Sequence, residues 1–355
     1  MKNKSNDYKT ALFDPSKIRM VSKVQSIYSL MSRVKHGEIE TPTYQRGNNI
    51  WTPEAKSRLI ESILVRIPIP VFYIDASDED KWKIIDGLQR ITSLKEFMIE
   101  DDDKKRLILE GLEYISDLNG CSFDQLPRTF QRRLEETDIT IIFINAGTPE
   151  NVKYNIFKRI NTGGQPLSGQ EIRHALNDGV ATPLLKKISE LPQFKDIWGK
   201  DNTRMENNEL VLRGLGYWFL ELSWIHENNF DDYLVDAMKT INKTEKTIRN
   251  IKVQKFLFAY ETCISIFDDQ VFRKISEQRR NPLNKNIYET WMAIFSQIDN
   301  IKIKKLIKKK KDVYSIFKNL IGDKKYYYSI ASRKPNSMNS RHIKLQKRLE
   351  DIYND

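Results

Sequence analysis

The sequence predicts an α+β N-terminal half followed by an all-α C-terminal half. Short runs of β-branched and aromatic residues, which are typical of strands, occur only in the first half, at 71–75, 81–86 and 138–146. After about residue 180 the apolar residues follow helical spacing instead, at 209–225, 231–267, 287–295 and 301–321. No run of about 18 apolar residues occurs, so we expect no membrane span.

The first elements are predicted from apolar spacing, prolines and caps. Helical spacing predicts a helix over 23–34, and Pro42 favours an extended chain before Trp51. Thr52 as N-cap and Pro53 in the first turn predict a second helix, which ends before Pro68.

The remaining elements of this half follow in order. Two short strands, 71–75 and 81–86, flank a polar turn, and a helix then runs to about Met98. A short hairpin with Gly111 at its turn is expected over 107–115, followed by a short helix within 122–136 and a strand over 138–146. A helix from about Thr148, a glycine-rich loop and a second helix complete the half. Ser168 and Glu171 form the capping box of that second helix.

Composition narrows the classes of partner. The chain has 355 residues and a net charge of +11, from 59 Lys and Arg against 48 Asp and Glu. Such a balance favours a polyanionic partner such as nucleic acid or nucleotide phosphates, although a Lys-rich and Asn-rich genome would produce the same excess. Two isolated cysteines, Cys121 and Cys263, have neither metal-site spacing nor a disulfide pattern. With a polar N-terminus that lacks a signal peptide, the sequence predicts a soluble cytoplasmic protein.

The stretch "KIIDGLQRITSL" carries the main candidate site. A strand that ends in Asp86-Gly87 and turns into a helix directs the first helical N–H groups at the turn, where an anion can bind. Arg90 offers a planar fork of donors for phosphate, Gln89 can orient a water, and Asp86 can hold a metal ion or orient Arg90. The alternative is a structural turn in which Asp86 caps the helix and pairs with Arg90.

Two further polar turns favour the phosphate interpretation. "TPTYQRGNNIW" offers Tyr44, Gln45 and Arg46 at the end of an extended segment. "FKRINTGGQPLSGQEI" offers Lys158, Arg159, Asn161, Thr162, Gly163 and Gly164 just before a helix. Glycine-rich loops beside Arg and Lys are a common way to surround phosphates, although "NTGG" alone lacks the Lys-Ser/Thr of a P-loop.

Together with "IPIPVFYI" and "EIRHAL", these stretches resemble a known family. Over roughly residues 20–180 the chain is similar to the DGQQR-motif domain at the N-terminus of GmrSD-type modification-dependent restriction enzymes, of the ParB/sulfiredoxin-like superfamily. The resemblance implies a ParB-like fold with a small mixed sheet and NTP hydrolysis coupled to DNA cleavage or sensing. The family's motif falls on Asp86, Gly87, Gln89 and Arg90. Thr92, which follows it, is a further expected phosphate contact, and the Tyr-Gln-Arg and Arg-Ile-Asn-Thr-Gly-Gly motifs fall on Tyr44–Arg46 and Arg159–Gly164.

The sequence departs from the family at two points. Leu88 stands where the motif usually has its first Gln, so hydrolysis is weakened if that Gln positions water and unaffected if Leu88 faces the core. GmrSD-type enzymes commonly carry an HNH nuclease domain, which needs clustered histidines. The four histidines here, His36, His174, His226 and His342, form no such cluster, so we predict no HNH domain. We expect His174 to lie on a helix surface.

The C-terminal region predicts a nucleic-acid surface. "IKIKKLIKKKK" reads as a basic amphipathic helix, and the tail adds further cations interleaved with tyrosines. Such a surface suits a phosphate backbone, although charge runs are usually solvated helix faces. The expected nucleic-acid contacts are Lys304, Lys305, Lys308, Lys309, Arg333, Lys334 and Arg341.

These observations lead to one domain plan and one leading function. We expect an extension over 1–20, a nucleotide-binding domain over 21–185 and a helical domain with a basic tail over 186–355. The leading function is an NTP hydrolase with Mg²⁺, held by Asp86, acting in restriction or antiphage defence against foreign DNA. The alternatives are a non-catalytic nucleotide or DNA sensor that works with a separate nuclease, and a nuclease or nickase. A homo-oligomer is compatible with each.

Overall fold

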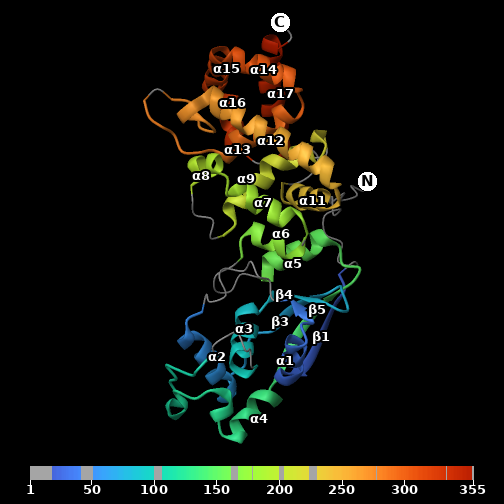
Figure 1. Ribbon diagram of the computed structural model, residues 1–355, viewed down its shortest axis with the longest axis vertical. Coiled ribbons are helices and arrows are strands. Elements are labelled where there is room, and N and C mark those ends of the chain that lie inside the picture. The colour runs from blue at the N-terminus through green and yellow to red at the C-terminus, as the bar shows by residue number, and fades with distance from the viewer. Residues whose placement is uncertain are drawn as a thin grey trace, which may run out of the picture. The chain divides into compact units, whose positions relative to one another are not determined.

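The computed structural model describes residues 18–40, 51–99, 106–160, 167–177, 179–199, 204–223, 230–276, 278–332 and 334–353. The chain forms two compact units, Met1–Leu176 and Asn177–Asp355. All the named strands belong to the first unit and the second is helical, which confirms the predicted order of an α+β half and an all-α half (Figure 1). The division falls before the boundary expected at 185. No helix among the described residues is long and apolar enough to cross a membrane.

The first unit is built on a mixed five-stranded sheet in the order β1-β5-β3-β4-β2. Its strands are β1 (Met20–Ser26), β2 (Ile39–Glu40), β3 (Phe72–Ala76), β4 (Trp82–Asp86) and β5 (Asp138–Asn145). β5 pairs antiparallel with β1 and parallel with β3, and β4 pairs antiparallel with β3 and parallel with β2. The small mixed sheet is therefore as predicted.

Four helices bury one face of this sheet. They are α1 (Ile27–Lys35), α2 (Pro53–Leu64), α3 (Leu88–Met98) and α4 (Arg128–Glu136). Their apolar sides share a core with Phe72, Ile74, Ile84, Ile141 and Phe143 of the strands. Asp75, which alternates with Ile74 along β3 and so points to the opposite face, binds Lys153 of α5 (Glu150–Ile160). α6 (Gly169–Leu176) ends the unit.

Two helix starts follow the predicted capping chemistry. The Thr52 hydroxyl accepts from the Ala55 N–H at the start of α2, and Pro53 occupies the first helical position. Before α6, Ser168 Oγ accepts from Glu171 N at 3.2 Å, while the Glu171 carboxylate accepts from Ser168 N. Both signals are local, so the sequence alone predicts them.

Two secondary-structure predictions for this unit are wrong. Residues 20–26, of which 23–26 were expected to be helical, form the edge strand β1, and Val24 is 63% exposed. Pairing with β5 overrides the helical spacing, and the helix begins only after Ser26, which caps it. The expected hairpin at 107–115 is absent from the described residues. Instead the Glu61 carboxylate of α2 accepts the N–H groups of Glu113, Tyr114 and Ile115.

The second unit has its own apolar core. Its α-helices are α7 (Ala181–Ser189), α8 (Pro192–Trp198), α9 (Glu206–Leu215), α11 (Phe230–Lys243), α12 (Lys246–Phe267), α13 (Lys285–Ser296), α14 (Asn300–Lys308), α15 (Lys310–Gly322), α16 (Lys324–Ala331) and α17 (Pro335–Tyr353). The continuous helical patterns expected at 231–267 and 301–321 are each divided. Glu245 caps the start of α12, and Lys309 separates α14 from α15.

Candidate nucleotide site

The turn Asp86-Gly87 joins β4 to α3. Gly87 has φ of 98°, a left-handed conformation that favours glycine. A Cβ at this position would lie 2.5 Å from Cδ1 of Phe72, so no other residue fits without displacement of the ring. The glycine therefore allows the chain to reverse tightly against β3 and to place the N-terminus of α3 beside the strand ends.

The N-terminus of α3 has no side-chain cap. Gly87 is the N-cap residue, and no side chain among the described residues accepts a hydrogen bond from the first-turn N–H groups. Asp86 instead turns its carboxylate to Arg90, with 2.8 Å between Oδ2 and Nη2. The sequence offered a structural turn as the alternative, in which Asp86 caps the helix and pairs with Arg90. The pairing with Arg90 is confirmed, and the capping by Asp86 is wrong. The first turn of α3 thus keeps N–H donors of the kind that bind anions.

Arg90 is held by the protein on several sides. Besides Asp86, its guanidinium donates to the carbonyl oxygens of Pro70 and Val71, the latter at 3.2 Å, and lies 4.4 Å from the ring centre of Phe72. The residue is only 8% exposed. Burial lowers the pKa of Arg90, and the Asp86 carboxylate opposes that effect. Arg90 therefore fixes the segment before β3 and orients Asp86 rather than presenting free donors to solvent.

Asp86 and Gln89 keep polar atoms available. The Asp86 side chain is 34% exposed, and only its Oδ2 is engaged by Arg90. The Oε1 atom of Gln89 is buried and has no hydrogen-bond partner among the described residues. An unpaired buried amide oxygen costs free energy unless a ligand or water satisfies it. Both atoms belong to the turn, so a polar ligand bound there would find two hydrogen-bond acceptors that the protein does not fully satisfy.

Leu88 and Thr92 have simpler environments. Leu88 is partly buried and packs against the core of the first unit. The sequence left open whether this departure from the family motif removes a polar contact, and the packing favours the core role. Thr92 is partly buried on α3, one turn after Leu88.

The other residues expected at this site are placed only in part. Tyr44, Gln45, Arg46, Asn161, Thr162, Gly163 and Gly164 lie outside the described residues. Lys158 and Arg159 are exposed in the last turn of α5, a helix that contacts β4. His174, expected on a helix surface, is instead buried.

Sequence reasoning missed a buried ion pair beneath α5. Lys153 donates to Asp75 Oδ2 at 3.0 Å and to Ser77 Oγ at 2.7 Å, and both charged side chains are buried. Ser77 in turn donates to Asp75 Oδ1. An acid at the end of an apolar strand was the only available signal, because nothing in the sequence links it to a lysine 78 positions away.

The described residues contain no group of three or more His, Cys, Asp or Glu side chains that could hold a metal ion. Asp86 is therefore a single carboxylate at this turn. That arrangement fits Mg²⁺ only in the form in which nucleotide phosphates and water supply most of the ligands.

The basic C-terminal surface is smaller than expected. Lys304, Lys308, Lys309 and Lys334 are exposed. Lys305 is partly buried and donates to the Tyr353 carbonyl at 3.0 Å, and Arg333 lies outside the described residues. Arg341 is 0% exposed and donates to Thr290 and to the carbonyls of Ser329 and Ser332. Its assignment as a nucleic-acid contact is wrong, because the side chain is fully buried in the helical core.

Comparison with protein-family models gives one match. Residues 27–177 match the family described as the GmrSD restriction endonuclease, N-terminal domain. This stretch, which is less than half of the chain, is similar to the GmrSD N-terminal domain. The match covers all the helices of the first unit, the strands after β1 and the Asp86–Arg90 turn, and it confirms the resemblance found in the sequence.

Two other comparisons found nothing. No curated protein and no solved structure matches the chain. The ParB-like classification of the GmrSD N-terminal domain therefore stays a prediction. The family itself indicates a role related to restriction and antiphage defence.

Proposed function

We propose that the first unit binds a nucleoside triphosphate at the Asp86–Arg90 turn and hydrolyses it in the service of restriction of foreign DNA. The observation that carries this proposal is the uncapped N-terminus of α3 beside Gly87. The helix dipole and the free N–H groups favour a phosphate there, and the left-handed glycine lets it approach the backbone. The adjacent acid does not block the position, because Arg90 holds it aside.

Each side chain of the turn has a distinct part in this proposal. Gln89 directs its unpaired amide oxygen at the attacking water, and Asp86 uses its free Oδ1 to accept a hydrogen bond from water. Arg90 is a positioning residue that holds Asp86 and the Pro70–Val71 backbone. Bound Mg²⁺ would neutralise charge on the phosphates, with Asp86 the one carboxylate at the turn to hold it.

A sensor without turnover is the second candidate. Its support from the sequence was Leu88 and the predicted absence of an HNH domain. The packing of Leu88 against the core weakens the first support. The two functions separate cleanly in an experiment, because a sensor binds nucleotide and releases no phosphate.

DNA is the expected partner of the second unit, with a separate nuclease as a further partner. The exposed Lys304, Lys308, Lys309 and Lys334 offer sequence-independent phosphate contacts. Replacing the four together with Gln should weaken DNA binding and reduce its dependence on salt concentration. If the fourfold variant binds DNA as tightly as the native protein, this surface is not the DNA-binding site.

The test of the proposal is phosphate release from a panel of nucleoside triphosphates with Mg²⁺, with and without DNA. We expect release by the native protein, and a loss of at least about tenfold in Asp86→Asn and in Gln89→Ala. Asp117→Asn, at an exposed acid on the same unit, is the matched control and should retain release. Binding without release in the native protein would favour the sensor. Equal phosphate release by the native protein and the three variants would show that the turn takes no part in hydrolysis.

A further inference from the structure

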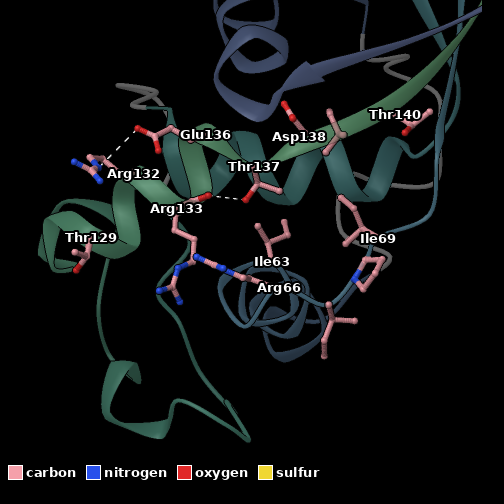
Figure 2. Close-up of a pocket in the computed structure, with 13 residues that line it drawn as sticks. Ile63, Arg66, Ile69, Thr129, Arg132, Arg133, Glu136, Thr137, Asp138 and Thr140 are labelled. Carbon is pink, nitrogen blue, oxygen red and sulfur yellow. Dashed lines mark hydrogen bonds and ion pairs between the residues drawn. The ribbon is translucent and has the colours of Figure 1, made fainter.

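A cavity of about 670 Å³ lies on the first unit and is not lined by any residue of the Asp86–Arg90 turn. Its walls come from the end of α2 and the segment after it, from α4 and from the start of β5 (Figure 2). Its size falls in the range of small-molecule sites, roughly 300–1,000 Å³. The wall combines an aliphatic part with three arginines, Arg66, Arg132 and Arg133.

Arg66 occupies a position that normally favours glycine. It follows the C-cap Val65 of α2 and has φ of 65°. The N–H of Arg66 donates to Ile63 and that of Ile67 donates to Ser62, which is the hydrogen-bond pattern of a Schellman motif. A residue with a Cβ is strained in this conformation. The strained position places the Arg66 side chain at the wall of the cavity, where a ligand can contact it.

The guanidinium of Arg66 has no partner in the part of the chain that the structure describes. The side chain is exposed, and its only interaction there is through its backbone. Arg133 reaches the same cavity from α4, and one of its Nη atoms donates to the Leu64 carbonyl at 2.8 Å. This bond fixes Arg133 next to the end of α2, while its other donors remain available. Two arginine forks from different elements thus line one cavity.

The remaining polar groups limit the charge of a ligand. Glu136 and Asp138 also line the cavity. The exposed Arg132 and Glu136 form an ion pair, with 3.7 Å between Nε and Oε1. Three arginines against two acids leave one net positive charge. A phosphate monoester, with a charge of about −1.5 to −2 at pH 7, comes closer to that balance than the more highly charged triphosphate does. Thr129 and Thr140 add hydroxyl groups, and the accessible Ile67, Pro68 and Ile69 form an apolar wall.

We propose that this cavity binds a small organic monophosphate, with its phosphate on Arg66 and Arg133 and its carbon skeleton against Ile67, Pro68 and Ile69. Arginine forks bind phosphate oxygens in pairs, and the apolar wall gives the organic part a contact that inorganic phosphate lacks. The site is separate from the nucleotide turn and does not depend on its function.

The test is calorimetric titration of the full chain with ribose 5-phosphate, inorganic phosphate and ribose. We expect ribose 5-phosphate to bind more tightly than inorganic phosphate, and ribose not to bind. Equal affinity for ribose 5-phosphate and inorganic phosphate would show that the apolar wall does not bind the carbon skeleton. Failure of both to bind at millimolar concentration would overturn the site.

Variants decide whether the binding is at this cavity. Arg66→Gly should weaken binding of ribose 5-phosphate at least about tenfold. It should also keep or raise the melting temperature, because glycine relieves the left-handed strain. Arg128→Ala, on α4 but outside the cavity, is the matched control and should bind normally. Gln89→Ala should bind normally as well, which separates this site from the nucleotide turn. Unchanged binding in Arg66→Gly would contradict the proposal.

Discussion

Two arginine–carboxylate clusters, one in each unit, have opposite relations to solvent. In the first unit Arg90 pairs with Asp86, whose side chain is 34% exposed. In the second unit Arg213 and Arg341 surround Glu289, whose side chain is 0% exposed. The first cluster leaves a carboxylate oxygen open at the end of a strand, whereas the second is closed within the helical core.

The closed cluster joins three helices. Arg213 of α9 contacts Glu289 of α13 and also Glu209, at 2.7 Å. Arg341 of α17 lies 4.0 Å from the other Glu289 oxygen. Burial opposes the charge of Arg213, but Glu289 and Glu209 outweigh it and raise the pKa of Arg213. Burial lowers the pKa of Arg341, and Glu289 only partly offsets this.

The difference shows that the same residue types stabilise the helical core of the second unit and leave a ligand-accessible carboxylate in the first unit. A buried carboxylate shared by two arginines has no room for a ligand, and its role is to neutralise them. Only one oxygen of the Asp86 carboxylate is engaged by Arg90, next to an uncapped helix N-terminus, so a ligand can bind the other oxygen. The predictions below separate these two roles.

The largest effect is expected for Glu289→Ala. Removing this carboxylate leaves two buried arginines without their shared counter-charge, which should cost about 3–5 kcal/mol of unfolding free energy. Chemical denaturation measures the loss. Glu190→Ala, at an exposed position on the same unit, is the control and should change stability by less than about 0.5 kcal/mol. A loss below about 1 kcal/mol for Glu289→Ala would show that the cluster is not closed.

Gly87→Ala should cause the next largest loss of stability. The new Cβ both enters a left-handed backbone and approaches the Phe72 ring, which together cost about 2–4 kcal/mol. Gly37→Ala provides the control, because Gly37 has φ of 71° with nothing within 4 Å of its Cβ position. It should lose only about 1 kcal/mol, from backbone strain alone. Equal losses in the two variants, measured by denaturation, would mean that the close approach to Phe72 does not constrain the turn.

A smaller effect concerns acid stability of the first unit. Burial raises the pKa of Glu61, but the N–H groups of Glu113, Tyr114 and Ile115 outweigh it, so the folded pKa lies below the ordinary 4.5. A carboxyl with a lowered pKa contributes stability above pH 4.5 that is lost as the pH falls through the folded value. Glu61→Gln should therefore lose stability at pH 7 and show a weaker decline in acid. A decline identical to that of the native protein would refute the role of Glu61.

The sequence predicts what is local and misses what is distant. Thr52, Ser168 and the strand–turn–helix at Asp86 follow from neighbouring residues, and all three are found in the structure. β1 was missed because its conformation depends on β5, more than a hundred positions away. Arg341 reads as a surface cation because a sequence does not show which basic residues meet a buried acid. Arg66 gave no signal, since its left-handed backbone appears only in three dimensions.

The most direct test of the nucleotide proposal is amide hydrogen exchange at the start of α3. The N–H groups of Leu88, Gln89 and Arg90 would be followed with and without a non-hydrolysable triphosphate and Mg²⁺. If phosphate binds the uncapped helix, these amides should exchange at least about tenfold more slowly with the ligand present. Unchanged exchange at these three amides, with protection elsewhere in the first unit, would contradict the assignment of the Asp86–Arg90 turn as the nucleotide site.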